Sequence, residues 1–171
     1  MSNLDAIREQ FGCGERDIRT YSPLTLAYIG DGVYEMIIRT VVVSRADRSA
    51  KQLHRTTIQY VSAVAQSKIY DVLAAGEATE GSSNSGTGDG SSNGAGKTGS
   101  GGSQLLSDEE LAVMKRGRNA GPSATSRNAT AAEYRKATGF EALMGYLYLS
   151  GRTDRAVELT RVGLERAGME I

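Results

Sequence analysis

The stretch from Gly76 to Gln104 contains no leucine, isoleucine, valine or aromatic residue and consists almost entirely of Gly, Ser, Thr, Asn and Ala. Such a stretch cannot bury enough apolar surface to offset the entropy lost on ordering, so we predict a flexible coil over residues 76–104. The rest of the 171-residue chain is long enough to build one hydrophobic core. We therefore expect a single domain over residues 1–171, with 76–104 as an insertion between two of its helices.

This insertion contains part of a phosphate-binding loop but not the whole motif. Gly94-Ala-Gly-Lys-Thr98 supplies the closing Gly-Lys-Thr, but Ser91 stands where the motif requires its first glycine. No apolar strand precedes the segment and no apolar helix follows it. These departures exclude a nucleotide-binding function for this segment.

Outside the insertion, the sequence carries repeated helix signals. Ser22-Pro23 provides an N-cap followed by proline at the first helical position. Three capping boxes follow, at Ser49–Gln52, Ser107–Glu110 and Thr130–Glu133. Apolar residues at helical spacing predict helices from Pro23 to about Val43, from Ser49 to Gly76, from Ser107 towards Arg116, from Thr130 to Gly151, and from Asp154 to Arg166. No useful alternating strand pattern occurs, so we predict an all-α helical bundle.

Two acids, Asp31 and Glu141, lie within otherwise apolar helical stretches. Removing a carboxylate from water is costly unless a cation is close to it. Two such acids, similarly surrounded and far apart in sequence, suggest one shared site, and their hard oxygen ligands suggest Mg²⁺ or Mn²⁺. The alternative is that each acid forms a buried ion pair with a basic residue: Arg39, Arg135 or Lys136.

Two further residues share a helix face with these acids. Glu35 follows Asp31 by four residues, and Thr138 precedes Glu141 by three. For Glu35, an ion pair with Arg39 is a better interpretation than direct metal binding. We expect Glu35 and Thr138 to support the site rather than to bind the metal themselves.

Charge and composition narrow the possible functions. The formal net charge is zero, but residues 115–136 carry six basic residues against one acid, which is typical of a surface that binds a polyanion, although an ordinary solvated face would look similar. Cys13 is the only cysteine and His54 the only histidine, which excludes a disulfide framework, a histidine-based triad and a multi-histidine zinc site. Without a signal core or a membrane span, the chain is expected to be cytoplasmic.

Four motifs together resemble the ribonuclease III family. Leu26-Ala-Tyr-Ile-Gly-Asp-Gly-Val-Tyr-Glu35 is similar to the signature helix of that family, and Phe140-Glu-Ala-Leu143 to its second acidic motif. Lys115-Arg-Gly-Arg-Asn-Ala120, with the Ser/Thr-rich loop after it, resembles the Mini-ribonuclease III branch, as does the stretch from Leu53 to Ser67. The four motifs occur in the order that the family has, between about Pro23 and Leu164.

This resemblance implies an all-α endonuclease that acts as a homodimer on double-stranded RNA, with Mg²⁺ bound by Asp31 and Glu141 and with Mn²⁺ as a substitute. It also implies RNA-backbone contacts from a basic group of residues: Lys115, Arg116, Arg118 and Asn119. The expected substrate is the precursor of large-subunit (23S) ribosomal RNA, which a large-subunit ribosomal protein could present. Because the chain ends at Ile171, no double-stranded-RNA-binding domain is expected after the catalytic one.

Two positions depart from the pattern of larger ribonuclease III enzymes. Ala27 stands where that pattern has a glutamate, and Thr138 where it has an aspartate, and the Mini branch resembles this chain in both. Fewer carboxylates leave more of a metal's shell to water and phosphate oxygens, so a higher Mg²⁺ requirement is expected. The expected reaction is metal-assisted phosphodiester hydrolysis that gives 5′-phosphate and 3′-hydroxyl ends. The alternative functions are a non-catalytic helical RNA-binding or ribosome-assembly module, and a plain dimeric scaffold.

Overall fold

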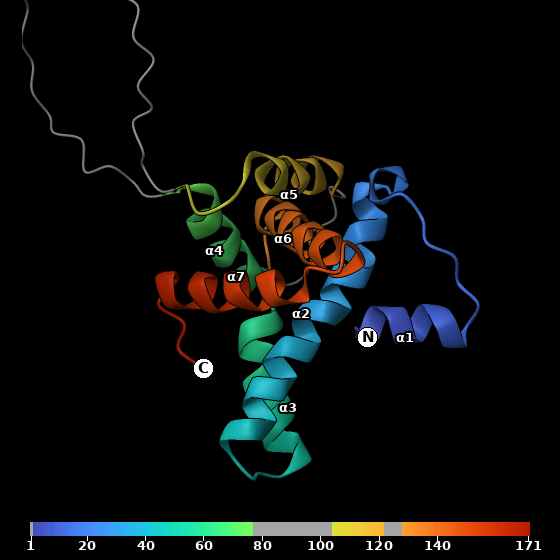
Figure 1. The fold of residues 1–171 in the computed structure, drawn as a ribbon. Coiled ribbons are helices and arrows are strands. Elements are labelled where there is room, and N and C mark those ends of the chain that lie inside the picture. The colour runs from blue at the N-terminus through green and yellow to red at the C-terminus, as the bar shows by residue number, and fades with distance from the viewer. Residues whose placement is uncertain (1, 77–103, 122–127) are drawn as a thin grey trace, which may run out of the picture.

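The computed structural model describes residues 2–76, 104–121 and 128–171 (Figure 1). The predicted insertion therefore lies almost wholly outside the described residues, as does most of the Ser/Thr-rich loop that follows the basic motif. The described residues form helices and no strand, which confirms the all-α prediction. Their bounds are α1 (Asn3–Gln10), η1 (Ile18–Thr20), α2 (Pro23–Arg45), α3 (Ala50–Val61), α4 (Ala63–Ala74), α5 (Asp108–Ala120), α6 (Ala131–Leu149) and α7 (Thr153–Arg166). None of these helices combines the length and apolar character that crossing a membrane requires.

Most helices begin where the sequence predicts. The Ser22 hydroxyl accepts a hydrogen bond from the Thr25 amide at the start of α2, and the Thr130 hydroxyl accepts one from the Glu133 amide at the start of α6. Each satisfies one of the amide groups that the first helical turn leaves open. Helix α1 was not predicted, because it buries only Leu4 and leaves its other apolar side chains largely outside the core.

The prediction of one helix between Ser49 and Gly76 is wrong, because this stretch forms two helices, α3 and α4. Ser62 has an extended backbone, with φ −66° and ψ 151°, which ends α3 and begins α4. Its hydroxyl accepts a hydrogen bond from the Ala65 amide at 3.3 Å, so a residue expected in mid-helix is an N-cap. Hydrophobic spacing continues across this break, and spacing alone therefore did not reveal it.

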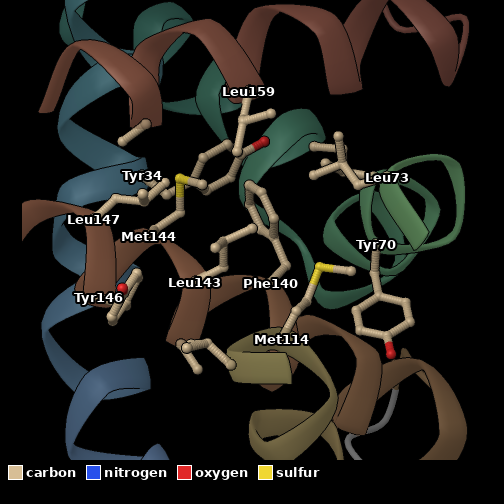
Figure 2. Close-up of a cluster of buried hydrophobic side chains, with 14 of the residues drawn as sticks. Tyr34, Tyr70, Leu73, Met114, Phe140, Leu143, Met144, Tyr146, Leu147 and Leu159 are labelled. Atoms are coloured by element: carbon tan, nitrogen blue, oxygen red, sulfur yellow. The ribbon is translucent and has the colours of Figure 1, made fainter. Parts of the chain in front are cut away.

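Helix α6 lies at the centre of the bundle, packed against α2, α4 and α5 (Figure 1). Its Phe140 is fully buried and meets Tyr34 of α2 edge to face, with ring centroids 4.9 Å apart. Figure 2 shows these core side chains converging from α2, α4, α5, α6 and α7. One core thus joins helices from both sides of the segment 77–103.

Glycines let α6 approach its neighbours closely. A Cβ added at Gly30 of α2 would collide with the backbone carbonyl of Glu141, and one added at Gly145 of α6 would collide with the carbonyl of Leu26. The backbones of α2 and α6 therefore touch at this crossing. On another side of α6, a Cβ at Gly139 would come within 2.6 Å of the Met114 carbonyl of α5.

A buried carboxylate fixes α5 against α7. Glu110, with no exposed surface, lies 2.6 Å from a guanidinium nitrogen of Arg152 and 3.0 Å from one of Arg155. It also accepts a hydrogen bond from the amide of Ser107, which completes the predicted capping box. A buried charge with this many partners is fully compensated, so it gives α5 a defined position.

Candidate functional site

The crossing of α2 and α6 brings the two predicted acids together. Asp31 follows Gly30, and the backbone of Glu141 lies where a Cβ at Gly30 would be. Both acids line an open cleft of about 320 Å³, together with Ala27 and Thr138, the two positions at which the chain departs from larger ribonuclease III enzymes. Two acids far apart in sequence thus share one site because glycine allows the helix backbones to touch.

The electrostatics of the pair are unusual for surface acids. Burial, and then the neighbouring carboxyl of Asp31, raise the pKa of Glu141 to about 8. Burial, and then the charge of Glu35, raise the pKa of Asp31. The two carboxyl groups also lie within hydrogen-bonding reach of each other. In the absence of a cation, the pair therefore favours keeping a proton between them.

Two of the three cations considered as partners of these acids are occupied elsewhere, and Arg135 forms no ion pair with any described residue. Arg39 lies 2.6 Å from Glu35, and Lys136 lies 2.8 Å from Asp71. Within the described ranges, neither Asp31 nor Glu141 forms an ion pair. The structure thus gives no support to the buried ion pairs considered as the alternative, and the acid site keeps an excess of negative charge when both carboxyls are ionised.

The two supporting residues have different places. Glu35 is partly exposed and held by Arg39 one turn along α2, as the four-residue spacing predicts. Thr138 is buried and lines the cleft, but its hydroxyl donates to the carbonyl of Tyr134 at 3.0 Å. Its oxygen keeps lone pairs free to accept a hydrogen bond from a bound water.

Gln66 is a residue of this site that sequence reasoning missed. It lies on α4 and is almost fully buried, and its side-chain amide lowers the pKa of both carboxyl groups. Its amide nitrogen donates to the carbonyl of Val61 at 3.1 Å. The available signal was Ser62, whose N-cap chemistry marks the helix break that places Gln66 here.

The predicted basic residues lie on the second half of α5. Lys115, Arg116 and Asn119 are exposed, while Arg118 lies over the ring of Tyr70, 5.9 Å from its centroid. The helix is fixed next to the acids through Gly117, where an added Cβ would come within 3.1 Å of the Thr138 carbonyl. Acids and basic residues therefore flank the same part of α6.

Carboxylates at this position fit a hard divalent ion. Mg²⁺ is commonly bound through one or two carboxylates, with water and phosphate completing its shell. Asp31 and Glu141 offer two carboxylates in an open cleft, and no group of three metal-binding side chains occurs in the described part of the chain. This donor set suits Mg²⁺ or Mn²⁺ and does not suit zinc, which prefers nitrogen and sulfur ligands.

Comparisons with known proteins agree with this arrangement. Residues 24–152 match the model of the ribonuclease III domain family. A Mini-ribonuclease 3 of Clostridium tetani is 35% identical over 149 residues, covering 86% of this chain and 80% of that protein. A Mini-ribonuclease 3 of Enterococcus faecalis is also 35% identical, over 90% of this chain and 96% of its own length.

A solved structure shares the fold. The crystal structure of a Fusobacterium nucleatum protein superposes with a TM-score of 0.64, covers 88% of this chain and 98% of that protein, and is 24% identical in sequence. Together with the family match and the two similar proteins, this result confirms both the resemblance and the fold. The chain belongs to the ribonuclease III family of endoribonucleases, in its Mini-ribonuclease III branch.

Proposed function

We propose that this endoribonuclease cleaves double-stranded RNA at the cleft between α2 and α6, with Mg²⁺ or Mn²⁺ held by Asp31 and Glu141. The observation that carries the proposal is the pairing of these two carboxyl groups in an open cleft without an ion pair among the described residues. Two adjacent acids repel each other once both are ionised, and a divalent cation relieves that repulsion.

The chemistry follows from this placement. A bound divalent ion would lower the pKa of its water and offset the charge that develops on the phosphate. Hydrolysis adds that water across the P–O3′ bond and leaves a 5′-phosphate and a 3′-hydroxyl. Asp31 and Glu141 act in their ionised form. Because Ala27 and Thr138 replace two carboxylates, half-maximal activity should need more Mg²⁺ than in a four-carboxylate relative.

The basic half of α5 is proposed to hold the RNA backbone beside the acids. Lys115 and Arg116 are exposed and make no ion pair with any described residue. The Arg118 guanidinium lies over the ring of Tyr70 and donates a hydrogen bond of 3.3 Å to the side-chain oxygen of Asn119. Contacts of this kind position a duplex without reading its sequence.

The substrate and partners are proposed from the Mini-ribonuclease III branch. They are a precursor of large-subunit (23S) ribosomal RNA, a second copy of the chain, and a large-subunit ribosomal protein that presents the RNA, all in the cytoplasm. Exposed apolar side chains on α2, Tyr28 and Met36 among them, support the second copy, since a monomer gains nothing by exposing them.

Replacing Asp31 with Asn tests the assignment of the site. Asp31→Asn should lower duplex-RNA cleavage by more than about 100-fold, since even groups that only orient a metal ligand contribute about 10- to 100-fold. RNA binding, measured with Ca²⁺ in place of Mg²⁺, should persist. Asp47→Asn, at an exposed residue between α2 and α3, serves as the control and should cleave normally. Normal cleavage by Asp31→Asn would show that the metal lies elsewhere.

A further inference from the structure

Tyr70 of α4 lies where α4, α5 and α6 meet. A Cβ added at Gly139 of α6 would lie 2.9 Å from Cε2 of Tyr70 and 3.1 Å from the backbone nitrogen of Arg118. Glycine at this position therefore leaves the space in which the ring lies beside the second half of α5. Figure 2 shows the Tyr70 hydroxyl pointing away from the other core side chains. The ring thus reaches from the core to the basic part of α5.

The buried ring and the guanidinium of Arg118 are in contact. Tyr70 is 2% exposed, whereas Arg118 is partly exposed and its guanidinium lies over the ring, 5.9 Å from the centroid. A cation within about 6 Å of a ring centroid is attracted to the ring face, and a guanidinium can also stack on it. Burial raises the pKa of the Tyr70 hydroxyl, and the positive charge of Arg118 offsets part of that rise.

The charge of Arg118 is not used by an acid of the described chain. Asp71, which follows Tyr70 and is the only acid of α4, lies 2.8 Å from the ammonium group of Lys136. Arg118 forms no ion pair with any described residue, and its guanidinium donates to the neutral side chain of Asn119 at 3.3 Å. A guanidinium held by a ring and an amide keeps its charge for an external anion such as phosphate.

Holding Arg118 in one orientation favours binding of that anion. A free arginine side chain loses rotamer freedom when it is fixed on a phosphate, which weakens binding. A side chain already held in the binding orientation has less freedom to lose. Ordering one such side chain corresponds to about 2- to 10-fold in affinity.

We infer that Tyr70 is a positioning residue of the RNA-binding surface, whose buried ring holds the Arg118 guanidinium in place to bind an RNA phosphate. This inference rests on the function proposed above. It assigns to α4 a part in a surface that otherwise consists of residues of α5. Arg118 makes the contact with RNA, and Tyr70 acts through Arg118.

The test is duplex-RNA binding by the full chain, measured by fluorescence anisotropy with Ca²⁺ in place of Mg²⁺. Tyr70→Leu removes the ring and should weaken binding by about 2- to 10-fold. In a chain that also carries Arg118→Ala, it should cause no further loss. Tyr70→Phe keeps the ring and removes only a buried hydroxyl without a partner among the described residues, so it should bind like the wild type with an unchanged or higher thermal midpoint of unfolding. Leu73→Ala, at another buried residue of α4, is the control and should lower the midpoint without weakening binding.

A second pair of variants leaves the core side chains unchanged. Arg118→Lys keeps the positive charge but loses the planar guanidinium that stacks on the ring, so it should weaken binding by a similar factor. Arg116→Lys makes the same exchange on the same helix, at a residue whose cation lies over no described aromatic ring. It should bind RNA like the wild type.

The outcomes separate this inference from the proposed function. If Tyr70→Leu loses as much affinity with Arg118→Ala as without it, or if Leu73→Ala loses as much, Tyr70 serves the fold and the inference is wrong. If Tyr70→Leu does not fold, equal losses in Arg118→Lys and Arg116→Lys overturn the inference. If Tyr70→Leu binds like the wild type while Arg118→Ala is weakened, the RNA contact stands and Tyr70 has no part in it. If Arg118→Ala binds like the wild type, the proposed contact of Arg118 fails, and the inference fails with it.

Discussion

At the scale of single residues, burial and the neighbouring charge of Asp31 both raise the pKa of the Glu141 carboxyl. Together these two effects raise this pKa from 4.5 to about 8, and the Gln66 amide lowers it only in part. Folding therefore favours the protonated carboxyl in the metal-free protein. Between these two pH values the folded state binds more protons than the unfolded state, so the free energy of unfolding falls as pH rises.

The difference in the pKa of Glu141 between the folded and unfolded states predicts how stability depends on pH. In EDTA, urea unfolding of the wild type should show stability declining from about pH 5 to about pH 8, by at most about 1.4 kcal/mol per pH unit. Glu141→Gln, which cannot ionise, should show a flatter profile and exceed the wild type in stability near pH 8.

A control separates this residue from the general charge balance. Glu9→Gln, at an exposed residue of α1, should keep the wild-type slope. Equal slopes in the wild type and Glu141→Gln would mean that this carboxyl titrates as an exposed glutamate does. Because a divalent ion needs the ionised form, adding Mn²⁺ should stabilise the wild type more at pH 8 than at pH 6.

At the scale of helices, the sequence was sufficient wherever a capping residue coincided with a change in hydrophobic spacing. Ser22 and Thr130 satisfy both conditions, and α2 and α6 begin where predicted. Ser62 satisfies only the first, because one extended residue leaves the apolar spacing intact on either side. The break was therefore missed, and with it the position of Gln66.

The proximity of Asp31 and Glu141 lies beyond what spacing can supply. It depends on the close contact of two helix backbones at Gly30 and Gly145. The sequence position of a glycine in a helix does not indicate which other helix will pack against it. The similar apolar surroundings of the two acids suggested one shared site, and the family resemblance supported that prediction. The cleft they line and the absence of an ion pair to either acid among the described residues come from the structure alone.

The contact between α2 and α6 can be tested by adding a methyl group. Gly30→Ala should destabilise the protein by about 1–3 kcal/mol or more, because the new Cβ meets the Glu141 backbone, which cannot move aside as a side chain can. Urea unfolding measures the loss. At Gly32 an added Cβ meets no described atom of the same chain within 4 Å, so Gly32→Ala should preserve stability or raise it by up to about 1 kcal/mol. Similar losses in both variants would locate the effect in α2 itself rather than in its contact with α6.

At the scale of the whole molecule, the formal charge sums to zero, but basic residues gather locally on the second half of α5. The basic half of α5 faces solvent at one end of the bundle, and α3 begins at the other end (Figure 1). A neutral protein gains no general attraction to RNA, so its affinity is expected to come from a local group of cations such as this one. Each cation that contacts a phosphate releases counterions, which makes binding weaken as salt increases.

The location of the RNA contact can therefore be read from the salt dependence of binding. Lys115→Ala should weaken duplex-RNA binding to a similar degree for all sequences and reduce the magnitude of the slope of log K against log salt concentration by about 1. Lys51→Ala removes another exposed lysine, at the start of α3, so it changes the net charge by the same amount but should leave the slope unchanged. Fluorescence anisotropy with Ca²⁺ in place of Mg²⁺ measures both without cleavage. If the two variants lose the same amount of slope, the RNA responds to total charge, and the contact does not lie on α5.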